Sequence, residues 1–408
     1  MPANQIKVTD KMAAVALDIF TQTSYVAANS VRSYEDEFSG SAKIGDSVRI
    51  KNPSKYNVQF GNNRAQPQAV GQTPKILTLD QNPYVEIALT SQELAVFTGT
   101  DVKAQREIME QGIANLARNV DTYMFGIMNQ TAMNQVARSS TTGVSYKDLS
   151  VMNSRLGGQL CPKGDRHIAA CALDLSQIQQ SISTLYNPDK EVEDAYMDGV
   201  VGTGLGFSKW LETESTGTQS IGTMTSATTS AAVTVEGSIS IPVTSTTGTL
   251  KAGQAFTCPG CYQIDPQTLT GKPILYTFVA AADVPATSTA IPIVTPIYDL
   301  NYPLLNMRNI SALPGSGATI TPIESQDAGK LATNIMGWHK KAVALACMDL
   351  PTDLPGAEAS KLSIDGLSIR IIRQYTLQNN AVNILADMQY GGMVLRPEWM
   401  VNMTGFAQ

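Results

Sequence analysis

Apolar residues recur with helical spacing in two segments near the start of the chain. In residues 9–31, Met12, Val15, Ile19 and Val26 follow one another at spacings of three, four and seven, which predicts an amphipathic helix. Residues 100–130 carry a longer stripe, made of Val102, Met109, Ile113, Leu116, Val120, Tyr123 and Ile127. This second helix would extend about 45 Å. Thr100 or Asp101 can cap it, and Gly112 weakens it by about 1 kcal/mol.

Alternation with period two predicts strands on either side of a polar segment. In "IGDSVRIKNP", Val48 and Ile50 alternate with two cations, which is typical of a half-exposed strand. A second strand is expected at residues 84–89, "YVEIAL". The residues between them, 53–74, are rich in Asn, Gln, Gly and Pro. We expect the two strands to pair around this polar tip as an extended β-hairpin loop, which has too little core to fold alone and so lies on a neighbouring molecule.

Helix and strand patterns alternate over residues 145–212 and are followed by a change in composition. Residues 211–250 contain no Lys or Arg, and roughly half of them are Ser or Thr. Short β-type runs separated by Gly and Pro continue to about residue 325, which predicts an all-β insert over 222–325. Afterwards, "GLSIRIIRQYTL" and "AVNILADMQYGGMVLRP" are expected to pair as antiparallel strands joined at 378–380. The predicted architecture is an α/β region interrupted by a β insert.

Composition narrows the functional class. Hydrophobic residues make up 43% of the 408 residues and charged residues only 16%, against about 25% charged in an ordinary soluble domain. Such a surface indicates extensive contact with other protein. The net charge of −6 argues against tight nonspecific DNA binding. No run of 18 apolar residues or secretory signal pattern is present, so neither a membrane span nor secretion is expected. Five cysteines without a signal indicate reduced thiols.

Cys258 and Cys261, in "CPGC", are the strongest candidates for chemistry. A zinc site would need four ligands, and no second such pair exists. A thioredoxin-like pair would open a helix after a strand, whereas this pair lies between extended runs. Because Pro-Gly is typical of turns, we interpret CPGC as a turn of a β-hairpin, and a metal or redox enzyme remains the alternative.

Other candidate motifs remain incomplete. "GTGLG" at 202–206 is not placed between a strand and a helix as a phosphate loop would be. His167 and His339 have no companion acid or nucleophile in a known arrangement. We therefore predict no catalytic residue, no metal and no cofactor, and a protein that is not an enzyme.

Several stretches, taken together and in order, resemble the major capsid proteins of tailed bacteriophages. They are "IGDSVRIKNP" with its polar loop, the long helix, "LKAGQAFTCPGCYQIDPQTLTGKPILYTFV", "NIMGWHKKAVALACMDLP" and "GLSIRIIRQYTLQNNAVNILADMQYGGMVLRPEWM". The resemblance is to the short-tailed-phage coat family with an inserted β-barrel domain, and it implies an α+β tailed-phage capsid fold. The implied parts are an N-terminal arm (1–37), an extended loop (38–90), a peripheral domain with the spine helix (91–144), an axial domain (145–221 and 326–396), the inserted barrel (222–325) and a C-terminal segment (397–408).

The resemblance also implies a function. The chain would be a structural major capsid protein that self-assembles into pentamers and hexamers of an icosahedral phage head enclosing double-stranded DNA. Its partners would be itself, a scaffolding protein, a portal and, weakly, the packaged DNA. It would assemble in the host cytoplasm and reside in the virion, without contact with a membrane. The alternative is a phage tail or surface adhesin, which the Ser/Thr-rich β segment suggests.

Charges on the extended loop and on the spine helix are complementary in sign. We expect loop cations to bind carboxylates of a neighbouring subunit. The candidates are Arg49, Lys51, Lys55 and Arg64 on the loop, and Glu107, Glu110 and Asp121 on or beside the helix.

Overall fold

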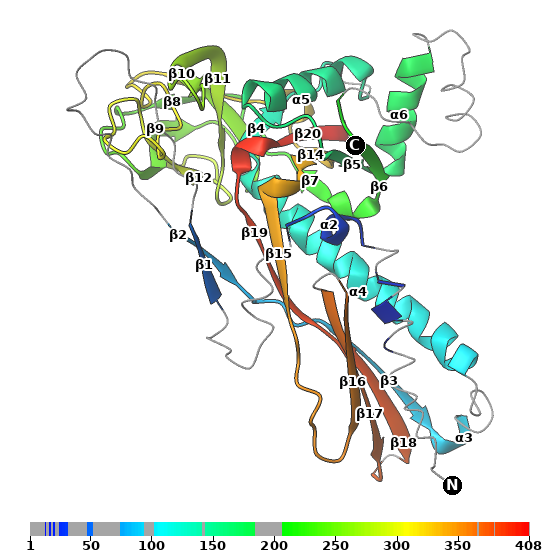
Figure 1. Ribbon diagram of the computed structural model, residues 1–408. Coiled ribbons are helices and arrows are strands. Elements are labelled where there is room, and N and C mark those ends of the chain that lie inside the picture. Colours follow the sequence, from blue (N-terminus) through cyan, green and yellow to red (C-terminus); the bar gives the residue numbers. More distant parts are fainter. Residues whose placement is uncertain are drawn as a thin grey trace. The chain divides into compact units, whose positions relative to one another are not determined.

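The computed structural model in Figure 1 describes residues 13, 16–17, 19–20, 24–31, 47–51, 74–93, 102–140, 143–183, 206–364, 367–378 and 380–407. The chain divides into two units. The first comprises Met1–Ile50, Ile76–Met124 and Val343–Met393, and the second comprises Lys51–Lys75, Phe125–Ala342 and Val394–Gln408.

Helix α4 (Val102–Thr131) runs without a break and confirms the predicted long helix. Within the first unit, Ile113, Leu116 and Val120 of the predicted stripe are buried. Gly112 does not interrupt the helix. A Cβ atom at this position would lie 2.8 Å from Cγ1 of Val85, so the glycine lets the helix approach strand β3 (Tyr84–Thr90) closely. The side chains of Val102 and Met109, and the capping candidates Thr100 and Asp101, lie outside the described residues.

A four-stranded antiparallel sheet of the first unit has the order β16-β17-β18-β3. Its other strands are β16 (Glu358–Ile364), β17 (Leu367–Thr376) and β18 (Ala381–Asp387). The β17–β18 hairpin confirms the predicted pair joined at 378–380. The predicted second strand is longer than the real one. It is divided at Met388, and its second half, β19 (Gln389–Val394), pairs with β15 (Val343–Met348).

The predicted partnership of the loop strands is wrong. Strand β1 (Ser47–Lys51) pairs with β2 (Pro74–Thr78), whereas the segment at 84–89 is β3, which pairs with β18. Strand β3 alternates exposed and half-buried residues along its whole length. Such a strand is stabilised when it pairs with a neighbouring strand and its half-buried side chains contact those of the neighbour. Strand β18 provides seven residues in register with it.

The second unit contains a mixed sheet in the order β4-β20-β14-β5-β6. Its strands are β4 (Asn134–Val136), β20 (Met400–Ala407), β14 (Leu331–His339), β5 (Arg166–Ala170) and β6 (Lys209–Glu212). Helices α5 (Tyr146–Gly158) and α6 (Ala172–Ser183) share a core with this sheet, formed by residues such as Leu149, Ile178, Ile335 and Met403. The predicted alternation of helix and strand is confirmed. Strand β20 was not predicted.

The predicted β insert leaves and rejoins this sheet at its central strand, β14. Strand β7 (Thr218–Ser220) pairs with β14, with Ser220 opposite Leu331. Between these residues lie β8 (Ala227–Thr229), β9 (Ser238–Thr246), β10 (Ala255–Ile264), β11 (Gly271–Val279), β12 (Ala290–Ile297) and β13 (Thr319–Pro322). They form one sheet in the order β11-β10-β13-β8-β9-β12. A further antiparallel bridge between Ala280 and Ile293 joins its two outer strands, so the sheet closes on itself.

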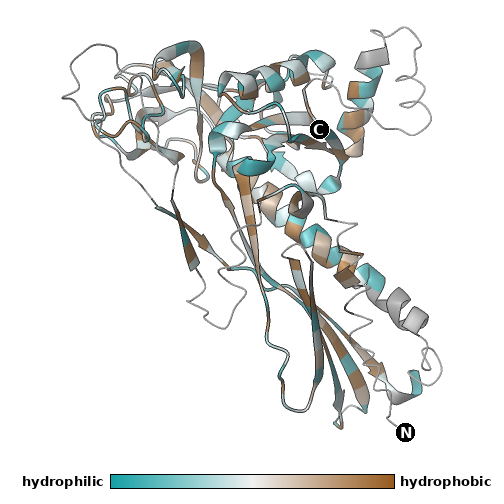
Figure 2. Ribbon diagram, viewed as in Figure 1, coloured by the Kyte–Doolittle hydropathy of each residue, from teal (hydrophilic) through white to brown (hydrophobic). Residues whose placement is uncertain are grey.

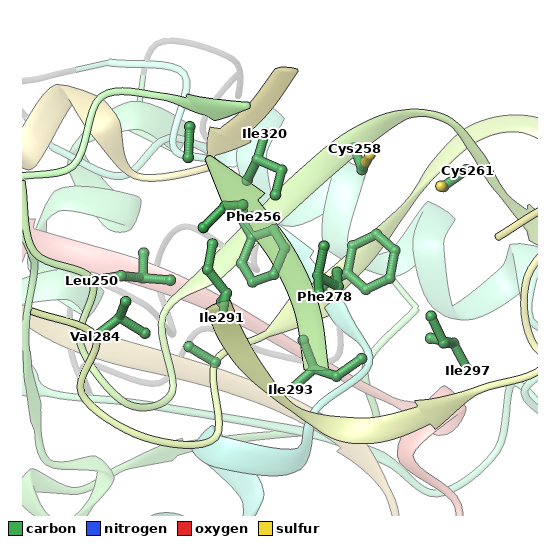
Figure 3. Close-up of a cluster of buried hydrophobic side chains, with 14 of the residues drawn as sticks. Leu250, Phe256, Cys258, Cys261, Phe278, Val284, Ile291, Ile293, Ile297 and Ile320 are labelled. Carbon is green, nitrogen blue, oxygen red and sulfur yellow. The ribbon is translucent and has the colours of Figure 1, made fainter. Parts of the chain in front are cut away.

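The inside of this closed sheet is apolar. Phe256 and Phe278 stack with their ring centroids 5.4 Å apart, and Ile291, Ile320 and Leu250 belong to the same buried cluster, shown in Figure 3. Residues 232–237, "AVTVEG", were predicted as a strand but form bends and a turn, with Gly237 at φ +77°.

The prediction that CPGC forms a hairpin turn is wrong. Residues 258–261 lie within strand β10. The turn between β10 and β11 comes later, where the Asp265 amide donates to the Thr270 carbonyl over 2.8 Å and the Asp265 carboxylate accepts from the Gln267 amide over 2.9 Å. Asp-Pro at 265–266 is itself a turn signal.

A buried ion pair lies where the closed sheet meets the mixed sheet. Nη2 of Arg138 and Oδ2 of Asp327 are 2.7 Å apart, with both side chains fully buried. Arg138 also donates to the carbonyl of Gly405 in β20. Glu324, three residues before Asp327, is buried as well. Burial, reinforced by the negative charge of Asp327, raises the pKa of Glu324 from 4.5 to about 8. The structure therefore holds Glu324 in its neutral form at neutral pH.

We predict that Glu324→Gln removes a loss of stability at alkaline pH. The pKa of Glu324 is higher in the folded than in the unfolded chain, so its contribution is fully present below about pH 4.5 and declines as pH rises toward about 8. At pH 9 the variant should exceed the wild type by about 2–4 kcal/mol in free energy of unfolding. Urea unfolding at pH 5, 7 and 9 measures this, with the exposed Glu212→Gln as control. Parallel profiles for wild type and Glu324→Gln would contradict the assignment.

Candidate assembly surfaces

The described residues hold no cluster suited to metal binding. No group of three or more His, Cys, Asp or Glu side chains among them could hold a metal ion. His167 and His339 are buried, and burial is the largest cause lowering both pKa values, that of His167 to about 4. Their rings lie beside Trp338 and Trp399, with centroids 5.7 and 5.3 Å apart respectively. Both histidines therefore act as neutral packing groups.

Two further expectations from the sequence concern the glycine-rich segment at 202–206 and a membrane span. Of "GTGLG", only Gly206 is among the described residues, with φ +81°. No helix in the described part of the chain has the length and apolarity that a bilayer span requires.

The predicted contact residues fall into three groups. Arg49 is exposed on β1 and Glu110 is exposed on α4. Lys51 ends β1 and Glu107 lies on α4, but their side chains are outside the described residues, as are Lys55 and Arg64 altogether. None of the ion pairs between described side chains includes Arg49 or Glu110. Both side chains are thus exposed and have no ion-pair partner among the described side chains.

Asp121 requires a correction, because it is buried and only 1% exposed. Its Oδ1 accepts from the Ser24 hydroxyl over 2.9 Å and from the Val26 amide over 3.0 Å. Its Oδ2 accepts from the Tyr25 amide over 2.8 Å. The amides of Tyr25 and Val26 are among the free N–H groups that begin helix α2 (Tyr25–Ala28). Asp121 therefore caps that helix from α4. Both carboxylate oxygens of Asp121 accept hydrogen bonds from its own chain. Asp121 is therefore no longer a candidate for contact with a neighbouring subunit.

The charge state of Asp121 follows from its surroundings. Burial raises its pKa to about 6, and the hydrogen bonds from Tyr25, Ser24 and Val26 oppose that rise. At neutral pH the carboxylate is mainly ionised and accepts with both oxygens. The sequence contains a signal for burial, because Asp121 is four residues from both Ala117 and Phe125, which are themselves buried.

Exposed apolar residues at the β17–β18 turn were missed by the sequence analysis. Leu377 is 85% exposed and Tyr375 49% exposed. The turn is held by the Tyr375 hydroxyl, 2.6 Å from Oδ1 of Asn380. Below it, Arg370 binds Asp387 through two hydrogen bonds of 3.0 and 2.5 Å. In Figure 2 hydrophobic and hydrophilic residues alternate along these strands. Two exposed apolar side chains, Tyr375 and Leu377, therefore lie beside this turn.

Comparison with known families shows which kind of protein carries these surfaces. The model of the P22 coat protein family, described as gene protein 5, matches residues 85–405. The chain belongs to the P22 coat protein family. It is accordingly a structural capsid protein of the bacteriophage type, and the resemblance drawn from the sequence, including the mixed α+β capsid fold, is confirmed. No curated relative matches the chain.

Several solved structures similar to this coat protein come from phages. That of Mycobacterium phage Che8 has a TM-score of 0.46 and 13% identity, and covers 93% of this chain and 90% of that chain. The capsid of cyanophage P-SCSP1u has a TM-score of 0.46 and 12% identity, with 90% and 86% covered. The capsid of Ralstonia phage GP4 has a TM-score of 0.45 and 8% identity, with 95% and 92% covered.

Replacing Asp121 tests its role as the anchor of α2. In Asp121→Asn, an amide nitrogen replaces one accepting oxygen and opposes an N–H donor, so we expect a loss of about 2 kcal/mol in free energy of unfolding. Hydrogen exchange at the amides of Tyr25 and Val26 should also accelerate. The control is Asp80→Asn, an exposed carboxylate that accepts from the Tyr123 hydroxyl over 2.7 Å. If Asp121→Asn leaves both amides as protected as in the control, Asp121 does not anchor the helix.

Proposed function

We propose that this coat protein is the major capsid protein of a phage head and self-assembles into pentamers and hexamers of an icosahedral shell that encloses double-stranded DNA. The observation that carries the proposal is the family match over residues 85–405. The low content of charged residues, 16%, suits a chain whose surface meets many copies of itself. The net charge of −6 allows DNA to be enclosed without being gripped.

The proposal extends to partners and location. A scaffolding protein and a portal would direct assembly in the host cytoplasm, and the finished shell would contact DNA weakly. The segment 222–325 would act as an inserted domain that stabilises the subunit, between the two parts of an axial domain. The role is structural rather than enzymatic. Nothing observed favours the adhesin alternative.

The test is electron microscopy of the full chain, expressed with and without its candidate scaffolding partner. Closed shells of uniform diameter with pentameric and hexameric capsomers are expected when the partner is present. Tubes or spirals of capsomers without it would also support self-assembly. A monodisperse monomer in both preparations, at concentrations where shells normally form, would contradict the proposal.

Within the shell, we infer that the loop cations bind the helix carboxylates of a neighbouring subunit. Arg49 supports this most directly, because it is exposed and has no ion-pair partner among the described side chains, and Glu110 is its counterpart. Lys51, Lys55, Arg64 and Glu107 join them through their charge and position in the sequence. A single exposed pair contributes about 0–1 kcal/mol. Repetition around a closed shell multiplies small contributions of this kind.

A charge exchange tests the contact. Arg49→Glu and Glu110→Lys should each lower the yield of closed shells about tenfold or more, since each places like charges together. The double variant should recover most of the yield. Lys163→Glu, at an exposed position of the second unit, makes the same change in net charge as Arg49→Glu and should assemble normally. Circular dichroism checks that every subunit folds. Normal assembly of both single variants, or a double variant no better than either, would exclude this pairing.

A further inference from the structure

The two cysteines of CPGC lie on the same side of strand β10, which a regular strand would not allow. Side chains alternate between the faces of a strand, so residues three apart point in opposite directions. Yet Cys258 and Cys261 are 0% and 1% exposed, and both belong to the apolar cluster inside the closed sheet. Figure 3 shows the two side chains beside Phe278.

A bulge produces this arrangement. Thr257 pairs with Thr277 and Tyr262 with Leu275, so β10 advances by five residues where β11 advances by two. Within the bulge Gly260 has φ +84°, a conformation that glycine adopts without strain. Pro259 and Gly260 are exposed. The extra residues thus turn outward together, and the cysteines on either side of them turn inward.

The paired thiols differ from the other three cysteines of the chain. The thiols of Cys258 and Cys261 interact, and this interaction lowers the pKa of Cys258 and raises that of Cys261. The other three thiols lie against oxygen atoms, as Cys258 itself also does at 3.8 Å from the Pro259 carbonyl. Cys171 lies 3.0 Å from Oδ2 of Asp174, and Cys161 and Cys347 lie 3.6 and 3.4 Å from backbone carbonyls. All five cysteines are free, and the Cys258 and Cys261 thiols interact with each other.

We propose that Cys258 and Cys261 are a redox-active pair that forms a disulfide within β10 by exchange with a small-molecule disulfide such as oxidised glutathione. Both thiols are buried, so the exchange takes place when the strand opens locally at the bulge. The thiolate of Cys258 then attacks one glutathione sulfur, the glutathione disulfide breaks, and one glutathione leaves and takes up a proton. Cys261 then loses its proton and attacks the Cys258 sulfur, releasing the second glutathione. Two protein thiols are oxidised and one glutathione disulfide is reduced to two thiols.

The expected consequence is a covalent tie across the bulge, at the least regular point of the ladder between β10 and β11. The pair would be a dithiol in reducing surroundings and a disulfide in oxidising ones. The ladder on either side need not change, because the bond would join two side chains that already face each other. This chemistry does not depend on the proposed assembly.

The equilibrium constant of the pair tests the proposal. The full-length protein is equilibrated with reduced and oxidised glutathione at a series of ratios, folded in buffer and unfolded in urea. Acid quenching, alkylation with N-ethylmaleimide and mass spectrometry of the peptide containing both cysteines give the fraction oxidised. If the fold holds the thiols together, the folded chain should form the disulfide with an equilibrium constant about tenfold or more above that of the unfolded chain.

The other cysteines and two variants serve as controls. Cys161, Cys171 and Cys347 should remain alkylatable at every ratio. Cys258→Ser and Cys261→Ser should each give only a mixed disulfide with glutathione at the remaining thiol. The main comparison uses the wild-type chain, so it holds even if a variant fails to fold. An equal or smaller constant in the folded chain, or a disulfide to a different cysteine, would overturn the proposal.

Discussion

The pairing of Ser220 with Leu331 is the contact on which the architecture of the second unit depends. Because the two residues are directly opposite in one antiparallel ladder, the chain leaves the mixed sheet and returns to it at one point. The Ile221 amide donates to the Lys330 carbonyl over 2.9 Å, and the Gly329 amide donates to the Ile221 carbonyl over 3.1 Å, which extends the closure by another pair. This short ladder is enough to hold the ends of the long segment together, because the entropic cost of closing a loop grows only slowly with its length. The whole of 221–330 can therefore be accommodated without a shift in register.

Buried amides then fix how the closed sheet meets the rest of the second unit. Nε2 of Gln159 donates to Oε1 of Gln263 over 3.1 Å, and Nε2 of Gln263 donates to Oδ1 of Asn134 over 3.3 Å. Asn134 in turn donates to the Met400 carbonyl over 3.0 Å. The series connects the end of α5, strand β10 and strands β4 and β20. Apolar surfaces alone would tolerate sliding, whereas hydrogen bonds are directional and costly to leave unmade.

Much of this fold is readable from the sequence, and the failures have physical causes. Helices α4, α5 and α6 have the expected period. Strand partners do not follow from a local pattern, so the predicted pairing of β1 with the segment at 84–89 failed, and Pro74 and Lys75 concealed β2 at the end of a polar stretch. Strand β20, "MVNMTGFA", has six consecutive buried residues and no alternation to detect. For the candidate surfaces, the sequence shows which residues are charged and which family the chain resembles. The burial of a polar residue is a weaker signal: Asp121 was placed among exposed residues, although the apolar Ala117 and Phe125 lie four residues before and after it.

The position of β20 also orders the events of biosynthesis. It lies between β4 and β14, with parallel neighbours on one side and antiparallel ones on the other. Residues 400–407 leave the ribosome after every other strand of that sheet. Until then the facing edges of β4 and β14 lack their partner, whereas all strands from β8 to β13 have already emerged. The closed sheet can therefore fold before the mixed sheet is complete. Until β20 emerges, the nascent chain must prevent the unpaired edges of β4 and β14 from pairing with other strands.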